Sequence, residues 1–357
     1  MKLDFIISNM SGGGAQRVMA ILVNHFITIN FDVRLITLYE SEDLYSLNPS
    51  IKRIRLIPSS SVKNKKIGAF LSLYKFYKHQ DSKPSVIISF ITLTNLISIL
   101  IARIFKIKII ASEHNSHLQV QSPKYLTKFT WQYIYRFADY ITVLTSYDIK
   151  FYEDRGVNVV IMPNPCTFKP INTNNHSRKK TILAVGSLNR FHHKGFDNLL
   201  NLLPPVLSKN SEWDLKIIGE GDKGLKYLTN LAQKNKITHK VEFTGFKNNV
   251  NEYMHSASVF VLSSRFEGLP MVLLEAMSQG MACVAYDCKT GPSDIIKNEY
   301  NGILVKDQNE HDMQEKLNSI IQDVDKRTSL SNNAILSLEK FSVEAVADRW
   351  KKLFNSL

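Results

Sequence analysis

Two glutamates with different surroundings, Glu267 and Glu275, lie in the stretch SSRFEGLPMVLLEAMSQG at residues 263–280. Pro270 suits the first turn of a helix that runs through the apolar residues after it. Glu267 then lies in the loop before the helix, where free backbone amides can bind an anion, and Glu275 lies about one and a half turns inside. Two carboxylates could be the acid–base pair of a glycosidase. They could also be two contacts of one ligand site built on a helix N-terminus.

A second loop carries two cations at short spacing. In GSLNRFHHKGFDNLL, residues 186–200, Arg190 and Lys194 follow an expected strand, and a glycine opens the next helix. An arginine fork and a lysine point charge beside a helix N-terminus suit a diphosphate. His192 and His193 have no carboxylate or cysteine at metal-ligand spacing, so we expect them to be loop residues. Hydrolases of neutral glycans need no such anion-binding loops, which favours the ligand-site interpretation.

Three consecutive glycines, Gly12 to Gly14, lie between an expected strand and an expected helix in SNMSGGGAQRVMAIL at residues 8–22. They allow a tight turn and close approach of the backbone to a ligand phosphate. The spacing is not G-x-G-x-x-G and no acidic residue follows at the dinucleotide position, which disfavours a nicotinamide or flavin site.

Short β-branched runs alternate with amphipathic helices along the whole chain. The segments that we expect to form strands are 3–8, 32–38, 51–57, 85–90, 107–112, 140–145 and 159–164, and then 181–187, 213–219, 240–245, 258–264, 282–287 and 302–306. This alternation predicts an α/β fold of two Rossmann-like, doubly wound domains that face each other across a cleft. Ligands bind outside the carboxyl ends of such strands, where the three motifs fall.

The domain boundary is expected within residues 163–180, where proline, asparagine and charge replace the apolar pattern. The domains are then 1–170 and 171–340, followed by an amphipathic helix at 341–354. A chain of 357 residues is long enough for two separate cores. Its three cysteines are too few and too scattered for a disulfide framework or a zinc site, which indicates a cytoplasmic protein with buried thiols.

The net charge of +13 is uneven, because residues 1–170 carry 21 basic and 11 acidic residues. Residues 51–83 alone hold nine basic residues and one acid. Apolar side chains interleave with this charge, namely Phe70, Leu71, Leu73, Tyr74, Phe76 and Tyr77. Such a stretch favours an anionic surface, and the alternative is a lysine-rich solvated face whose aromatic residues lie in the core.

Residues 86–110 are nearly all apolar and imitate a membrane span. Their β-rich, helical and again β-rich parts predict a buried strand–helix–strand unit instead. We therefore expect a protein that rests on a membrane and does not cross it.

Taken together, these motifs resemble retaining glycosyltransferase family 4, of the bacterial surface-polysaccharide type, with the GT-B fold. The E-x7-E pair in SRFEGLPMVLLEAMSQG looks like the family's signature, and GGGAQRV, SEHN at residues 112–115 and GSLNRFHHKGFD are similar to its other loops. IIGEGD, VEFTGF, GPSDII and NGILV fall in the family's order. The resemblance covers most of the chain.

The resemblance implies a set of site residues. The catalytic residues would be Glu267, His114, Arg190 and Lys194. The donor-binding residues would be Gly13, Gly14, Gly186, Arg190, Lys194, Gly219, Thr244, Gly245, Phe246, Glu267, Gly268, Leu269, Pro270, Met271, Val272 and Glu275. Glu267 would bind the donor sugar and Glu275 the ribose, while the cations stabilise the leaving diphosphate.

The resemblance also implies the mechanism and the roles of the domains. Residues 1–170 would bind the acceptor, residues 171–340 the nucleotide sugar, and the helix 341–357 would return to the first domain. The acceptor hydroxyl would attack on the face that the nucleotide leaves, with no metal and no other cofactor. A D-x-D motif, Asp323 to Asp325, lies in a polar helical stretch, and we interpret it as chance.

As a member of this family, the protein would transfer a hexose or N-acetylhexosamine from a nucleotide sugar, by expectation a UDP sugar. The acceptor would be a lipid-linked glycan in capsule, O-antigen or exopolysaccharide synthesis, at the inner face of the cytoplasmic membrane. The expected partners are the donor, this acceptor and an anionic membrane surface, and not nucleic acid. The alternatives are a transferase for a soluble acceptor and a non-catalytic nucleotide-sugar-binding protein.

Overall fold

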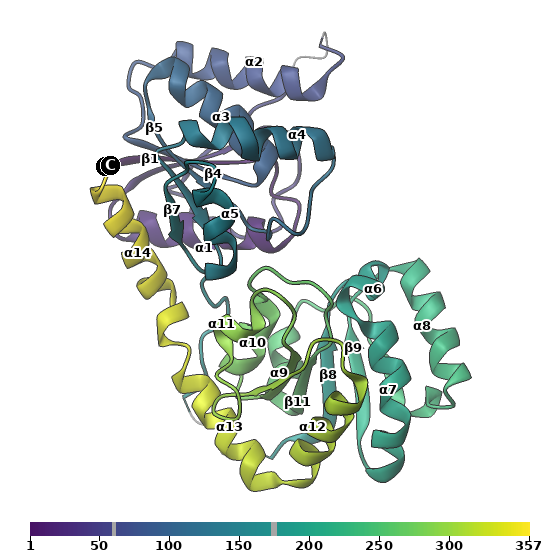
Figure 1. Cartoon of the computed structure of the whole chain (residues 1–357). Coiled ribbons are helices and arrows are strands. Elements are labelled where there is room, and N and C mark those ends of the chain that lie inside the picture. The colour runs from purple at the N-terminus through teal and green to yellow at the C-terminus, as the bar shows by residue number, and fades with distance from the viewer. Residues whose placement is uncertain (59–61, 173–176) are drawn as a thin grey trace. The chain divides into compact units, whose positions relative to one another are not determined.

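The computed structural model describes residues 1–58, 62–172 and 177–357, which form two compact units (Figure 1). The first unit comprises Met1–Pro165 with Phe341–Leu357, and the second comprises Cys166–Lys340. The chain therefore first passes from one unit to the other after Pro165, instead of after residue 170 as expected; we call this point the first crossing. The reason is that Cys166 and Thr167 already contact the second unit, where their side chains hydrogen-bond to residues of a single helix.

The first unit is built on a parallel sheet with the strand order β3-β2-β1-β4-β5-β6-β7. Its strands are β1 (Lys2–Ile7), β2 (Asp32–Thr37), β3 (Lys52–Arg55), β4 (Val86–Phe90), β5 (Lys108–Ser112), β6 (Tyr140–Val143) and β7 (Val159–Ile161). Its helices are α1 (Gly14–Thr28), α2 (Lys65–Lys78), α3 (Thr92–Phe105), α4 (Lys124–Phe129), α5 (Ile149–Glu153) and α14 (Val343–Asn355), with a π-helix η1 (Thr130–Ile134) and 3₁₀ turns η2 (Tyr135–Phe137) and η3 (Ser146–Asp148).

The second unit repeats this architecture with a parallel sheet in the order β10-β9-β8-β11-β12-β13. Its strands are β8 (Lys179–Val185), β9 (Asp214–Ile218), β10 (Val241–Phe243), β11 (Ala257–Leu262), β12 (Ala282–Tyr286) and β13 (Ile303–Val305). Its helices are α6 (Phe191–Lys194), α7 (Phe196–Lys209), α8 (Asp222–Lys234), α9 (Val250–Ser256), α10 (Met271–Ser278), α11 (Pro292–Ile295), α12 (Glu310–Gln322) and α13 (Val324–Leu336), with 3₁₀ turns η4 (Leu188–Arg190), η5 (Thr238–Lys240) and η6 (Glu339–Phe341). Each segment that we expected to form a strand contains a strand of the structure. The predicted α/β fold class, with two doubly wound parallel sheets, is confirmed.

The apolar segment 86–110 folds as β4, α3 and the start of β5. Every residue of β4 is buried, and α3 packs against both β4 and β5. The hydropathy of the segment therefore comes from burial on two sides, as predicted. Within the described residues, no helix combines the length and the apolarity that a membrane span requires.

The basic stretch 51–83 contributes α2, which packs on α3 (Figure 1). Its aromatic side chains face inward, since Tyr77 is buried and Phe70, Tyr74 and Phe76 pack against the core. Of the apolar residues expected at an anionic surface, only Leu71 is more than a third exposed, at 39%. The aromatic residues are thus core residues, and the exposed side of α2 presents lysines with Leu71 and Ile67.

A buried ion pair fixes α2 to the sheet. The guanidinium of Arg34 on β2 donates to both carboxylate oxygens of Asp4 on β1, at 2.6 and 2.5 Å, and both side chains are almost inaccessible. The Tyr77 hydroxyl of α2 donates to the same carboxylate at 2.6 Å. Gln80 accepts a further Arg34 hydrogen bond at 2.8 Å. The Asp4 carboxylate of β1 therefore accepts hydrogen bonds from a neighbouring strand and from a helix, and it compensates the Arg34 charge, which burial alone would make costly.

Replacing Asp4 with alanine should destabilise the first unit by about 3–5 kcal/mol, because it leaves the buried Arg34 guanidinium without its counter-charge. The free energy of unfolding from chemical denaturation measures this. Asp32→Ala, at the exposed first residue of β2, is the matched control and should change it by less than about 0.5 kcal/mol. Equal effects of the two substitutions would contradict this role of the Asp4 carboxylate.

Candidate functional site

The carboxyl ends of β8 and β11 carry the two motif loops of the second unit. These strands are neighbours in the sheet, so the loop after β8, residues 186–195, meets the loop after β11, residues 263–270. Two hydrogen bonds join the loops directly: the Ser263 hydroxyl donates to the Lys194 carbonyl at 2.9 Å, and the Arg265 amide donates to the His193 carbonyl at 2.9 Å. Parallel-strand topology thus brings together motifs that lie far apart in the sequence.

Gly195 makes this approach possible. Its φ of +66° lies in the left-handed region, and a Cβ atom built on it would lie 1.8 Å from the Ser263 carbonyl oxygen. No side chain fits there without moving one of the loops. The glycine that the sequence places before α7 is therefore required by contact with the neighbouring strand as well as by the turn.

Lys194 and Glu267 form an ion pair at this junction. The Lys194 ammonium donates to Glu267 Oε1 at 2.8 Å, and the two side chains are only 16% and 10% exposed. Burial alone would raise the pKa of the Glu267 carboxyl, but the charge and the hydrogen bond of Lys194 outweigh it and hold this pKa below its ordinary value. An ionised carboxylate committed to a cation is a poor proton donor, which speaks against the glycosidase acid–base pair.

The backbone after Glu267 is held close to the start of α10. The Thr290 hydroxyl donates to the Glu267 carbonyl, and a Cβ on Gly291 would lie 2.2 Å from the Gly268 carbonyl oxygen. Pro270 precedes α10, whose first residue is Met271. The first amides of a helix have no intrahelical acceptor and carry partial positive charge. The segment from Gly268 to Val272, predicted to bind the donor, therefore contains an anion-binding helix terminus next to the ion pair.

Glu275 has a different environment. It is buried inside α10, at 5% exposure, and accepts a hydrogen bond from the Thr167 hydroxyl. Thr167 enters the second unit directly after the first crossing of the chain. The two glutamates therefore have different partners, Lys194 for Glu267 and Thr167 for Glu275.

Arg190 is positioned by a residue that we expected to be a plain loop residue. Its guanidinium donates to His193 Nε2 at 2.9 Å. Burial, and next the charge of Arg190, lower the pKa of His193 to about 4, so the imidazole is neutral and can accept this hydrogen bond. The two residues lie three apart, one helical turn, and this spacing is the only sequence signal for the pair.

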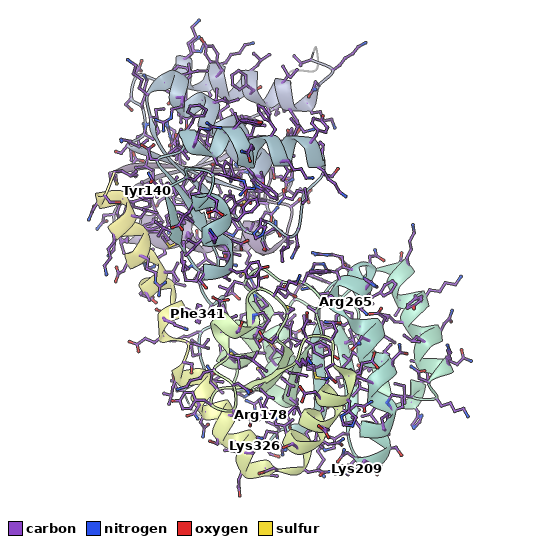
Figure 2. The ribbon with its side chains drawn as sticks, viewed as in Figure 1. Tyr140, Arg178, Lys209, Arg265, Lys326 and Phe341 are labelled. Carbon is purple, nitrogen blue, oxygen red and sulfur yellow. The ribbon has the colours of Figure 1, made fainter. Side chains whose placement is uncertain are left out.

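A second cation braces the same loop. Figure 2 marks Arg265, which donates to the Asp197 carboxylate at 2.7 Å and to the His192 carbonyl of α6. It therefore ties the loop after β11 to the start of α7, and this contact was also not predicted from the sequence.

Glycines join the remaining strand ends. A Cβ on Gly219, whose φ is +152°, would lie 1.9 Å from the Gly186 carbonyl oxygen, and a Cβ on Gly186 would lie 3.2 Å from Lys194 Cγ. The Gly219 amide donates to the Gly245 carbonyl at 3.0 Å. Gly186 thus lies against the Lys194 side chain, and Gly219 lies against Gly186. Thr244 and Gly245 directly follow β10, and the Phe246 ring beyond them is 56% exposed.

The remaining predicted residues belong to the first unit. Gly13 precedes α1 with a φ of +121°, and Gly14 is the first residue of that helix. The Tyr45 hydroxyl lies 3.2 Å from the Gly13 nitrogen and 3.1 Å from its carbonyl oxygen. A side chain remote in sequence therefore holds the glycine loop in its positive-φ conformation.

His114 follows β5 and contacts the Phe90 ring at 4.1 Å between centroids. Its Nε2 lies 3.2 Å from the Ser112 hydroxyl. Burial lowers the pKa of His114 to about 3, so its imidazole is neutral at physiological pH. A neutral imidazole can share a hydrogen bond with a hydroxyl group without adding charge.

Glu113 next to it was not predicted from the sequence. Burial raises the pKa of its carboxyl to about 7, although Tyr135 and Thr92 donate hydrogen bonds to it. A buried carboxyl with such a strongly raised pKa is typical of functional sites, and it lies here directly after β5.

The described residues contain no group of three His, Cys, Asp or Glu side chains that could hold a metal ion. The D-x-D motif has a structural role, because Asp323 caps α13 by accepting from the Lys326 amide at 2.8 Å. The three cysteines are buried, as expected, and burial raises the pKa of the Cys288 thiol to about 12.

Two family models match consecutive parts of the chain. The model described as Glycosyltransferase Family 4 matches residues 12–167, and the model described as Glycosyl transferases group 1 matches residues 168–337. The two matches meet within two residues of the first crossing between the units.

Relatives with similar sequences span the full chain. One is the GalNAc-alpha-(1->4)-GalNAc-alpha-(1->3)-diNAcBac-PP-undecaprenol alpha-1,4-N-acetyl-D-galactosaminyltransferase of Campylobacter jejuni, 29% identical over 99% of this chain and 98% of its own. Another is the amylovoran biosynthesis glycosyltransferase AmsD of Erwinia amylovora, 28% identical over 99% of each chain.

Solved structures share the fold. The lipopolysaccharide outer core galactosyltransferase WaaB superposes with a TM-score of 0.78 at 22% identity and full coverage of both chains. Anabaena HepE in complex with UDP superposes with a TM-score of 0.79 at 14% identity, again over both chains in full.

The substitution Gly195→Ala should destabilise the second unit by more than about 3 kcal/mol, because the new Cβ would overlap the Ser263 carbonyl oxygen. Gly245→Ala is the matched control in the same unit. Its φ of +72° is nearly the same, but nothing lies within 4 Å of its Cβ, so only the left-handed penalty of about 1–2 kcal/mol remains. Free energies of unfolding measure both, and similar values would contradict the contact between the loops.

Proposed function

Since the chain belongs to glycosyltransferase family 4 and has the GT-B fold, we propose that it is a retaining, metal-independent hexosyltransferase. It transfers a hexose or N-acetylhexosamine from a UDP sugar to a hydroxyl of a lipid-linked glycan in bacterial surface-polysaccharide synthesis. The observation that supports this proposal most is the buried pair of Lys194 and Glu267 at the start of α10.

The donor's diphosphate is bound by positive groups that surround this pair. Lys194 is positioned by its ion pair with Glu267, and Arg190 is held by the neutral His193. The first amides of α10 add the positive end of a helix. As the sugar–phosphate bond breaks, negative charge grows on the leaving nucleotide, and donors placed in advance stabilise that charge without reorganising.

The donor's sugar and nucleoside are bound on either side of the diphosphate. Glu267 accepts hydrogen bonds from sugar hydroxyls, and Glu275 binds the ribose hydroxyls after release from Thr167. The backbone of Thr244 to Phe246 holds the base. Uridine as the base is supported by the bound UDP in the structurally similar HepE.

The reaction proceeds with retention and without a protein nucleophile. The acceptor hydroxyl attacks the anomeric carbon on the face from which the phosphate leaves, and the leaving phosphate takes the proton. Glu267 is bound to a cation and does not act as the base. Arg190, Lys194 and the α10 amides supply the positive charge that a divalent metal supplies in other transferases.

The acceptor is a lipid-linked glycan because the full-length relatives act on such molecules or make surface polysaccharides. The name of the Campylobacter jejuni relative places its glycan on undecaprenyl diphosphate, and AmsD serves amylovoran synthesis. This acceptor lies in the membrane, so the protein works at its cytoplasmic face. The lysines around the start of α2, with exposed Ile67 and Leu71 between them, attract it to anionic lipids.

Lys194→Ala and Glu267→Ala should each lower kcat/KM for sugar transfer by about a hundredfold or more, because each removes charge stabilisation at the diphosphate or its positioning. A screen of donor hydrolysis across nucleotide sugars identifies the donor first, and transfer is then measured with it. Lys180→Ala removes a lysine from an exposed ion pair with Glu212 in the same unit and should leave transfer unchanged. Wild-type transfer in both site variants would show that the site assignment is wrong.

Anionic vesicles should bind the protein at low salt and release it at high salt, since the attraction is screened. Neutralising Lys63, Lys65 and Lys66 to glutamine should weaken binding by about a hundredfold, at about 1 kcal/mol per lysine. Vesicle sedimentation measures this. The exposed lysines of α8, Lys223, Lys226 and Lys234, give the matched triple control, which should bind like the wild type. Absence of binding at low salt would disprove the membrane proposal.

A further inference from the structure

Aromatic and basic side chains alternate along α4 and η1 of the first unit. Tyr125, Phe129 and Tyr133 recur every fourth residue and are 72%, 47% and 52% exposed. Lys124 and Lys128 precede the first two of them by one residue and are also exposed. Exposing several neighbouring aromatic rings to water is unfavourable in free energy, and such apolar patches mark sites of interaction. The helix changes here from α to π, a change that often occurs at functional sites.

A pocket of about 590 Å³ opens among these residues. Tyr125, Phe129 and Tyr133 contribute to its lining, and Trp131 and Phe151 form an inner wall in which their rings pack edge to face at 5.4 Å. This volume is in the range of small-molecule sites. The lining is mostly aromatic, and all of it comes from the first unit.

Positive and hydrogen-bonding groups lie against this wall. The Arg155 guanidinium lies 3.6 Å from the centroid of the Phe151 ring, and the His117 imidazole stacks on the same ring at 4.1 Å with an interplanar angle of 8°. Lys128 also lines the pocket. Of the described residues that line it, none is acidic. The pocket therefore combines a hydrocarbon-binding surface with cations for an anion.

The carboxylate that contacts His117 belongs to Asp148 and already accepts several hydrogen bonds. Asp148 accepts from His117 Nδ1 at 2.6 Å, from the His117 amide at 3.0 Å and from the Ser116 hydroxyl at 2.8 Å. These bonds fix the imidazole and leave Nε2 as its other hydrogen-bonding atom. Asp148 therefore orients the imidazole so that Nε2 is available to a ligand in the pocket.

We propose that this pocket binds the isoprenoid diphosphate part of the lipid-linked acceptor. The aromatic wall and Tyr125, Phe129 and Tyr133 contact the isoprenoid next to the phosphate, and Lys128, Arg155 and His117 bind the diphosphate oxygens. The inference rests on the proposed function and adds to it the place where the acceptor's lipid is recognised.

The chemistry of the lining selects this occupant over others. A free glycan would need polar groups spread over the pocket, whereas the lining here is mainly aromatic carbon with its charge in Lys128 and Arg155. A simple hydrocarbon would leave these cations unused. A nucleic acid would need cations along an extended groove, and this pocket is compact. An isoprenyl diphosphate matches both the aromatic lining and the cations, because it joins an apolar chain to an anionic diphosphate.

Isothermal titration with geranylgeranyl diphosphate tests this directly on the full chain. We expect saturable binding at least tenfold tighter than that of geranylgeraniol or inorganic pyrophosphate. Tyr125→Ser combined with Phe129→Ser should weaken it at least tenfold, and Lys128→Glu should do the same. These residues are exposed, so the variants should fold, and circular dichroism verifies this. Tyr300→Ser and Lys234→Glu, at exposed positions of the second unit, should bind like the wild type.

Equal affinity for pyrophosphate, or unchanged affinity in the double variant, would overturn the inference. A transfer assay separates it from the proposed function. The double variant should raise KM for a lipid-linked acceptor and leave donor hydrolysis without acceptor unchanged. If the wild type transfers sugar and the double variant has an unchanged KM for the acceptor, the pocket does not bind the acceptor, but the proposed transferase activity stands. If no nucleotide sugar supports transfer or hydrolysis, the proposed transferase activity is wrong. The pocket proposal still stands in that case if the isoprenyl ligand binds through these residues.

Discussion

The contact of Gly195 with the Ser263 carbonyl is the constraint on which the site of the second unit depends. It brings the loops after β8 and β11 to van der Waals distance, and only a residue without a side chain permits this. Lys194 precedes this glycine, and Glu267 lies four residues after Ser263, so the same approach sets the distance between ammonium and carboxylate. The glycines at the neighbouring strand ends extend this packing to Gly186 and Gly219.

Burial then assigns the charge state of each group. In the second unit it keeps His193 neutral, so that the ring accepts from Arg190, while the adjacent cation keeps Glu267 ionised. In the first unit it keeps His114 neutral and raises the pKa of the Glu113 carboxyl to about 7. Positive charge at the site is thus concentrated on residues that suit a diphosphate, and the histidines contribute hydrogen bonds without further charge.

In the first unit, charged residues that stabilise the fold and charged residues that can bind a ligand lie in different places. Buried charge serves structure, because Asp4 compensates Arg34 and fixes α2 through Tyr77. Exposed aromatic and basic residues of α4 and η1 instead surround a pocket whose chemistry matches a lipid diphosphate. An ion pair in the core and cations on aromatic rings at the surface use the same residue types, and accessibility to solvent decides which role each has.

Much of the architecture follows from the sequence, because its signals are local. Buried parallel strands read as short β-branched runs, and glycine or proline marks the turns at their carboxyl ends. This was enough to place each strand, to interpret the segment 86–110 as strand, helix and strand, and to find the motif loops. It also predicted that Glu267 and Lys194 lie in loops at the same edge of a sheet, where the structure pairs them, because parallel topology gathers such loops there.

The tertiary structure decided what depends on contacts between distant residues. The hydrogen bond of His193 to Arg190, the cap that Asp323 gives to α13 and the burial of the α2 aromatic residues follow from packing that sequence spacing does not fix. The same holds for the aromatic pocket, since Phe151 and His117 meet α4 and η1 only after folding. The charge of a titratable group depends on solvent exposure and neighbouring charge, and both are properties of the folded chain.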